Sequence, residues 1–198
     1  MKRFAVGLTG GISSGKTIAS KYLERFFRVI DADCIVHEIY ALNSVLIEQI
    51  AQRFGSDCIH GGEVHRPTLR SKVFGNPGAL KDLNSLVHPH VGARLKSGII
   101  SARKNSIPSL FVIPLLFENS WQNELDSTLL LGCTKELQIQ RMRKRDGSSK
   151  EEANQILSSQ MPEEKKRELC DFYILNNRDI PWLHMQLKTW AERLLGEE

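Results

Sequence analysis

The segment of residues 10–17 reads GGISSGKT and matches the phosphate-loop pattern G-x-x-x-x-G-K-[ST] at every fixed position. It follows the apolar run of residues 4–8 and precedes residues 18–27, a stretch compatible with a helix. The motif is meaningful only between a strand and a helix, and this context makes an ordinary glycine turn the weaker interpretation. The segment therefore predicts a strand–loop–helix unit at the start of an α/β fold.

The residue types of this segment suit the binding of a polyphosphate. Gly10, Gly11 and Gly15 let the backbone bend closely around phosphates, so that its N–H groups point inward. The following helix adds the positive end of its dipole. Lys16 supplies a mobile charge for the β- and γ-phosphates, and the Thr17 hydroxyl can ligate Mg²⁺. We expect the chain to bind a nucleoside triphosphate.

Composition narrows the classes of partner. With 198 residues, of which 41% are hydrophobic and 25% charged, the chain is expected to form one globular domain that carries insertions. The net charge of +4 and the 7% of aromatic residues are too low to indicate a nucleic-acid partner. No run approaches the roughly 20 apolar residues of a membrane span. The four cysteines form no C-x-x-C pair, and we expect reduced thiols in a cytoplasmic protein.

Short apolar runs without alternation predict the strands of a parallel sheet that is buried on both faces. They are residues 4–8, 28–31, 110–113, 128–131 and 172–175. With helices between them, these runs indicate an α/β sandwich whose ligands bind at the carboxyl ends of the strands. The phosphate loop and the segments after the second, third and fourth strands are therefore expected at one edge of the sheet.

The second and third predicted strands are separated by an interval far longer than an ordinary crossover. Its apolar residues recur with helical spacing, and glycines together with His88 and Pro89 interrupt the pattern. A helix is therefore expected to begin just after Pro89. We interpret residues 34–106 as a helical insertion that covers the site and contacts a substrate. The alternative is extra scaffold with no ligand role.

A second departure from a simple sandwich is the charged segment of residues 141–170. Its basic residues crowd the end of the helix expected after the fourth strand: Arg141, Arg143, Lys144 and Arg145. A break at residues 146–149 precedes two charged helical pieces, residues 150–160 and 162–170. Such runs are often solvated faces, but here we interpret the segment as a lid that closes over the nucleotide and excludes water. The nucleotide-binding core is then residues 1–33, 107–140 and 171–198, and it ends in a helix over residues 181–195.

The reaction class follows from missing motifs as well as present ones. There is no D-x-x-G, and residues 134–137 lack the aspartate of the N/T-K-x-D guanine motif, which argues against a switch GTPase. An ATP-driven motor needs an apolar strand that ends in Asp-Glu, and none is present. Phosphoryl transfer needs positioning, charge neutralisation and an in-line acceptor. A short chain with a helical insertion and a basic lid therefore suits a kinase for a small acceptor.

Asp31 and Asp33 follow the second predicted strand, where one or both should face the transferred phosphoryl group. A carboxylate at that position can accept the proton of an attacking hydroxyl or help to hold Mg²⁺. The alternative is that one of the two caps the following helix, and spacing alone does not decide which.

GLTGGISSGKT, VIDAD, an HP pair, PLLFE, the R-x-x-x-R-D start of the lid and SSQM follow one another along the chain. In this order they resemble the dephospho-coenzyme A kinase family over residues 4–177, and DAD, PLLFE and R-x-x-x-R-D are the most specific part of the likeness. The resemblance implies a P-loop kinase of the three-layer sandwich type, with a parallel sheet, a helical acceptor-binding insertion and a lid. It also implies that ATP, with Mg²⁺, phosphorylates the ribose 3′-hydroxyl of dephospho-coenzyme A to give coenzyme A and ADP.

The roles of the family are expected at the matching positions of this chain. The resemblance implies Asp33 as the base, with Lys16 and Arg141 as the other catalytic residues. The nucleotide is expected to contact Gly11, Ile12, Ser13, Ser14, Gly15, Lys16, Thr17, Arg141, Arg145 and Asn177, with Thr17 on the metal. The acceptor is expected to contact Thr9, Asp33, Leu69, Phe74, His88, Pro114, Leu115, Leu116 and Glu118. A histidine before proline is more often structural, which is the alternative for His88. Neither nucleic acid nor a membrane is an expected partner, and the sequence leaves the oligomeric state undecided.

The chain departs from the family pattern in two places. Ser13 replaces a glycine of the phosphate loop, which costs on the order of 1 kcal/mol if the position needs a positive φ. LNNR at residues 175–178 replaces the usual D-N-x-G, so the adenine contacts are expected to differ, and Arg178 is a candidate to stack on the base. Two other functions stay open: a nucleoside or nucleotide kinase of the same fold, and a non-catalytic ATP-binding regulator. A regulator would not need Asp33.

Overall fold

The computed structural model describes residues 4–196 and divides into two compact units. The first unit comprises the chain up to Ile30 and from Ile99 onward, and the second is Asp31–Gly98. The sequence placed the insertion at residues 34–106, which are similar bounds. The outermost ends of the predicted core, residues 1–3 and 197–198, lie outside the described residues.

A five-stranded sheet in the order β2-β5-β1-β6-β7 forms the centre of the first unit. The strands are β1 (Ala5–Thr9), β2 (Arg28–Asp31), β5 (Ser109–Val112), β6 (Ser127–Gly132) and β7 (Phe172–Leu175). β1 pairs in parallel with β5 and β6, and β6 pairs in parallel with β7. Each strand coincides with a run predicted from the sequence to within one residue at either end, so the predicted parallel sheet is confirmed.

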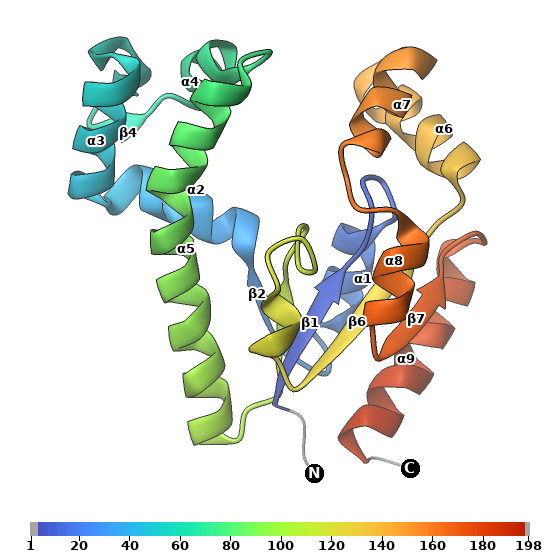
Figure 1. Cartoon of the computed structure of the whole chain (residues 1–198). Helices are drawn as coiled ribbons and strands as arrows, with labels where there is room; N and C mark the ends of the chain where they lie inside the picture. Colours follow the sequence, from blue (N-terminus) through green and yellow to red (C-terminus); the bar gives the residue numbers. More distant parts are fainter. Residues whose placement is uncertain (1–3, 197–198) are drawn as a thin grey trace. The chain divides into compact units, whose positions relative to one another are not determined.

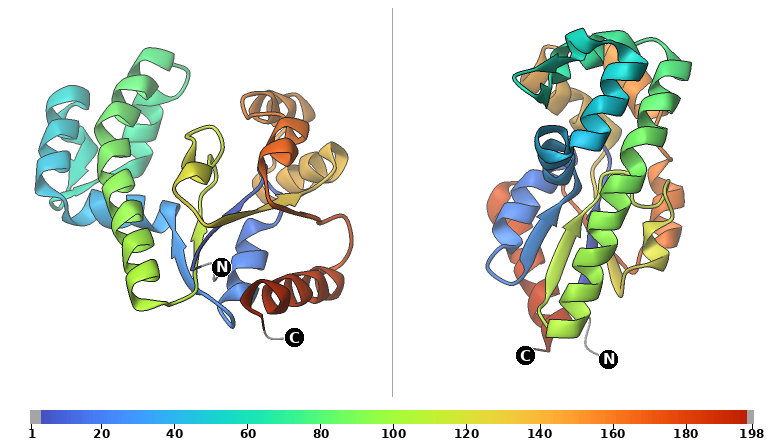
Figure 2. Two further views of the ribbon diagram at one scale, coloured as in Figure 1. Left: turned by 60° about the horizontal axis from the view of Figure 1, so that its bottom comes forward. Right: turned by 90° about the vertical axis from the view of Figure 1, so that its left-hand side faces the viewer.

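One face of this sheet is covered by α1 (Lys16–Leu23) and α9 (Ile180–Leu195), which lie on the same side in Figure 2. Apolar side chains of four strands meet both helices there, and Leu8, Leu129 and Leu187 are fully buried. Asp179 caps α9 by accepting a hydrogen bond from Trp182 N. The last predicted helix, residues 181–195, is therefore confirmed with a start one residue earlier.

The charged segment after β6 folds as three helices, α6 (Lys135–Asp146), α7 (Lys150–Ser158) and α8 (Glu163–Leu169). Figure 1 shows α6 and α7 beyond the carboxyl ends of the strands, whereas α8 packs beside β6 and β7. The expected break is present: Gly147 has φ 69°, and Ser149 with Glu152 forms a capping box that starts α7. Within residues 4–196, none of these or the other helices combines the length and the apolar character that a membrane span needs.

The second unit is mostly helical. Its elements are α2 (Ala32–Leu42), α3 (Ser44–Phe54), a 3₁₀ turn η1 (Ser56–Cys58), the strands β3 (Ile59–His60) and β4 (Glu63–Val64), α4 (Arg66–Val73) and the part of α5 (Pro77–Asn105) up to Gly98. Leu46, Ile50 and Leu69 are among its buried residues. The antiparallel pair of β3 and β4 was not predicted, because the glycines between the strands read only as an interruption.

The prediction that a helix begins just after Pro89 is wrong. α5 runs without interruption from Pro77 to Asn105 and contains Pro89. A proline inside a helix removes one N–H and presses on the carbonyl of the residue four positions earlier, at a cost of about 3 kcal/mol. Leu83, Val87 and Leu95, on both sides of Pro89, are buried at helical spacing. Their packing offsets the cost, so the helix continues through the proline.

Candidate functional site

The phosphate loop has the close backbone geometry that its glycines predict. A Cβ on Gly10 would lie 2.4 Å from the main-chain oxygen of Leu131, and a Cβ on Gly15 would lie 2.4 Å from Asn176 Nδ2. Gly15 also has φ 103°, which disfavours any other residue. Ser13 has φ 57°, so this position does carry the conformation that glycine prefers. The loop therefore retains its shape despite the serine, with the strain expected from the sequence.

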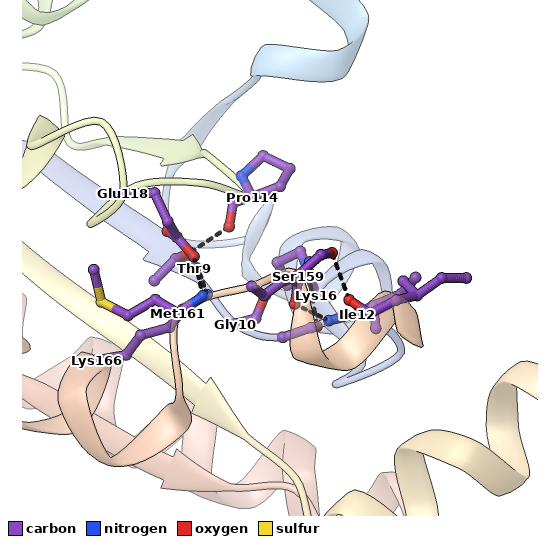
Figure 3. Close-up of polar contacts among 12 residues, drawn as sticks. Thr9, Gly10, Ile12, Lys16, Pro114, Glu118, Ser159, Met161 and Lys166 are labelled. Atoms are coloured by element: carbon purple, nitrogen blue, oxygen red, sulfur yellow. Dashed lines mark hydrogen bonds and ion pairs between the residues drawn. The ribbon is translucent and has the colours of Figure 1, made fainter. Parts of the chain in front are cut away.

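Lys16 is the first residue of α1, and its side chain arches back over the loop (Figure 3). Its Nζ donates to the main-chain oxygens of Gly10 at 2.8 Å and Gly11 at 3.0 Å. The ammonium group therefore lies over the loop rather than in solvent away from it. Thr17 follows in the first turn of α1 with an exposed side chain.

Two side chains from distant segments hold the loop from outside. Arg141 of α6 donates to the main-chain oxygens of Ser13 at 3.2 Å and Asn176 at 3.1 Å. Asn176, after β7, is buried and donates to the oxygen of Ser14 at 2.7 Å. The sequence pointed to the neighbouring Asn177, whose Oδ1 accepts from the main-chain nitrogen of Thr134 at 3.0 Å. Asn176 was not predicted as a site residue, although an amide directly after a predicted strand is a usable signal.

The two arginines predicted to belong to a lid have different surroundings. Arg141 is half-buried against the loop, whereas the side chain of Arg145 is 57% exposed and forms an ion pair with the adjacent Asp146 at 2.6 Å. A hydrogen bond and a charge interaction with Asp146 raise the pKa of Arg145 further, so it is a cation at any physiological pH.

We expect Arg141→Ala to lower kcat/KM by about 10²-fold, because the variant loses a charge beside the phosphates and the support of two loop carbonyls. Arg145→Ala is expected to cost less, since its partner is Asp146. Arg143→Ala is the matched control, an exposed arginine of the same helix. Steady-state kinetics of the three variants make the comparison. Equal losses in Arg141→Ala and Arg143→Ala would contradict the assignment.

The residues of the first unit that are predicted to contact the acceptor differ in burial: Thr9 and Leu116 are buried, whereas Leu115 is exposed. Thr9 is fully buried, and its hydroxyl donates to the main-chain oxygen of Pro114 at 3.1 Å, which links β1 to the loop after β5. Leu115 is 41% exposed. Leu116 is fully buried, and a Cβ on Gly7 would lie 2.6 Å from it. The Leu116 side chain therefore belongs to the core, and only its main chain could reach a ligand.

Glu118 ends this loop with its carboxylate already engaged. Its Oε1 accepts a hydrogen bond from Met161 N at 3.2 Å and lies 2.7 Å from Lys166 Nζ. Figure 3 shows these groups on one side of the phosphate loop. The prediction that Glu118 contacts the acceptor therefore competes with a role inside the protein.

The predicted residues of the second unit differ in exposure. Asp31 Oδ1 accepts from Asp33 N at 2.8 Å, so Asp31 is the cap of α2, and Asp33 is an exposed residue of its first turn. Leu69 is 2% exposed and belongs to the core of this unit. Phe74 is 80% exposed, and His88 is exposed on α5.

Several polar side chains around the phosphate loop were not predicted from the sequence. Gln138 Nε2 donates to Ile12 O at 2.9 Å, and Gln160 Oε1 accepts from Ile12 N at 3.1 Å. Tyr173 donates to Glu163 Oε1 at 2.8 Å. Burial, together with this carboxylate, raises the pKa of Tyr173 to about 12, so the phenol remains a donor at neutral pH. A cavity of about 660 Å³ beside the loop is lined by Gly11 and by these side chains, which is the size of a ligand pocket.

Comparison with known proteins identifies the family. The family model of the dephospho-CoA kinases matches residues 4–181. The dephospho-CoA kinase of Oceanobacillus iheyensis is 36% identical over 95% of this chain and 96% of its own, and that of Latilactobacillus sakei is 33% identical over 96% and 95%. The structure of the dephospho-CoA kinase from Campylobacter jejuni superposes with a TM-score of 0.72 at 26% identity and covers 98% of both chains. The chain therefore belongs to the dephospho-CoA kinase family.

Proposed function

We propose that the protein transfers the γ-phosphoryl group of ATP to the ribose 3′-hydroxyl of dephospho-coenzyme A, giving coenzyme A and ADP. The observation that carries this proposal is the complete phosphate loop, with Lys16 over its carbonyls, in a chain of the dephospho-CoA kinase family. The likeness covers nearly the whole chain, including the segments that are proposed here to bind the acceptor and the nucleotide.

The loop fits a triphosphate. At Gly10 and Gly15 any side chain would collide with the surrounding protein, so the main chain itself forms the wall that faces a ligand. Lys16 would exchange its hydrogen bonds with loop carbonyls for the β- and γ-phosphate oxygens. This charge neutralisation is the part of the chemistry that the loop supplies.

Mg²⁺, when bound with the nucleotide, would supply positive charge that neutralises part of the phosphate charge. Thr17, an exposed residue in the first turn of α1, is proposed as the side chain that would ligate it. Among the described residues no cluster of three or more His, Cys, Asp or Glu side chains could hold a metal ion. The remaining ligands of the ion are proposed to be phosphate oxygens and water, which Mg²⁺ prefers.

Asp33 is proposed as the base that accepts the proton of the attacking hydroxyl. The cap of α2 is Asp31, which removes helix capping as the explanation for the Asp33 side chain. The second unit is proposed to bind the acceptor, and residues 141–170 are proposed as the lid that closes over the nucleotide.

Two finer predictions stay proposals. The four cysteines carry free thiols, which agrees with a reducing compartment such as the cytoplasm. The absence of nucleic-acid or membrane partners rests on composition alone.

The deciding experiment is ADP release by the purified protein with Mg-ATP and dephospho-coenzyme A, beside a panel of free nucleosides and nucleotides and a control without acceptor. We expect turnover only with dephospho-coenzyme A. Turnover with a free nucleotide would show that the acceptor is a nucleotide and not dephospho-coenzyme A, and it would leave the proposed ATP site unchanged. ATP binding without turnover on any acceptor would favour the non-catalytic regulator.

A further inference from the structure

The junction between α7 and α8 contacts two substrate loops through consecutive residues. Gln160 accepts a hydrogen bond from Ile12 N, in the phosphate loop, at 3.1 Å. Met161 donates its main-chain N–H to Glu118, in the loop after β5, at 3.2 Å. Figure 3 shows the hydrogen bond that joins Met161 to Glu118. A two-residue segment therefore ties the nucleotide loop to a loop proposed for the acceptor.

The Glu118 end of this link is fixed by a buried cation. The Lys166 side chain is 2% exposed, and its Nζ lies 2.7 Å from Glu118 Oε1. Breaking a buried ion pair leaves an unpaired buried charge, which is far more costly than losing a surface pair. Glu118 therefore cannot leave Lys166 easily, and the loop after β5 is held to α8.

The Ile12 end is held from both sides. While Gln160 accepts from Ile12 N, Gln138 of α6 donates to Ile12 O at 2.9 Å. The approach is close, because a Cβ on Gly11 would lie 2.5 Å from Gln138 Nε2. The main-chain N–H and C=O of Ile12 are thus both hydrogen-bonded to glutamine side chains. These bonds restrict the movement of the loop and do not involve Lys16 or Thr17.

We propose that Gln160, Met161, Glu118 and Lys166 form a brace that sets the distance between the phosphate loop and the loop after β5, with Gln160 as a positioning residue for phosphoryl transfer. This rests on the proposed function. Gln160 acts through Ile12, and Glu118 acts through Met161. Transfer requires the two reactants within a narrow range of separation, and a displacement of about 1 Å can cost roughly 10²-fold in rate. The brace therefore acts on kcat more than on binding.

The test is Gln160→Met, which retains the size and flexibility of the side chain but removes the acceptor of the Ile12 N–H. We expect kcat to fall about 10-fold or more, with KM for ATP and for dephospho-coenzyme A changed less than about 3-fold. Gln155→Met is the matched control, an exposed glutamine of α7, and should behave as wild type. Unchanged kcat in Gln160→Met, or an equal loss in Gln155→Met, would overturn the proposal.

A double-mutant cycle tests whether both ends act as one device. Glu118→Gln retains the acceptor for Met161 N and removes the charge that faces Lys166. If the brace acts as one unit, kcat of the double variant, Gln160→Met with Glu118→Gln, should be at most about 3-fold lower than kcat of the more impaired single variant. If the fold-losses in kcat of the two single variants multiply in the double variant, the two residues have independent roles, and the proposal of one brace is overturned.

Hydrogen exchange on Gln160→Met keeps the test decisive if Glu118→Gln does not fold. Faster exchange at the amides of both Ile12 and Met161 supports the brace, whereas faster exchange at Ile12 alone contradicts it. This readout needs no turnover. An inactive wild-type protein would therefore contradict the proposed function without affecting the test of the brace.

Discussion

Lys16→Ala is expected to lower kcat/KM for ATP-dependent phosphorylation by about 10²–10³-fold, which corresponds to roughly 3–4 kcal/mol of transition-state stabilisation. Lys16 is the cation that stands over the phosphate loop, with Nζ 2.8 Å from the oxygen of Gly10. Charge moves toward the phosphate oxygens during transfer, and a preorganised cation stabilises the transition state more than the bound ground state. Steady-state kinetics with dephospho-coenzyme A as acceptor give the value.

The control for this prediction is Lys21→Ala, an exposed lysine of the same helix, which should retain wild-type kinetics. Thermal unfolding of Lys16→Ala should remain within a few degrees of wild type, because the variant loses hydrogen bonds that lie partly in solvent. Kinetics of Lys16→Ala like those of the wild type would show that the loop is not the phosphate site of the reaction.

The sheet was predictable because its signal is local. The three central strands β1, β5 and β6 are short continuous apolar runs that are buried along their whole length, and turn residues or helices separate the runs. The phosphate loop was predictable for the same reason: eight consecutive residues carry the motif. Asp31 and Asp33 were located but not distinguished, because either can cap a helix until the backbone places Asp31 at the cap position.

The continuity of α5 and the surroundings of the loop depend on contacts that are distant in sequence. Gln160 and Ile12 are 148 residues apart, and Asn176 and Ser14 are 162 apart. No local pattern marks such pairs. Lys166 is the clearest case: it stands in a charged run that predicts a solvated helix face, yet it is buried because Glu118 pairs with it. The sequence shows that a charged side chain is present, but not which distant residue pairs with it and allows it to be buried.

Asp33→Asn is expected to lower kcat by about 10²-fold or more while the affinity for ATP changes by only a few fold. The amide has nearly the shape of the carboxylate but cannot accept the proton of the attacking hydroxyl. Asp33 is exposed in the first turn of α2, and its main-chain N–H, rather than its side chain, takes part in the cap. The substitution should therefore leave the helix intact, and equilibrium binding of ATP separates the loss of chemistry from a loss of affinity.

Asp31→Asn is the matched control, since it removes the same charge two residues earlier. Asparagine caps helices as well as aspartate does, so the hydrogen bond to Asp33 N should persist. We expect kcat within about 3-fold of wild type for this variant. A large loss in Asp31→Asn with near-normal kcat in Asp33→Asn would transfer the role of base to Asp31, and losses in neither would place proton acceptance outside this pair.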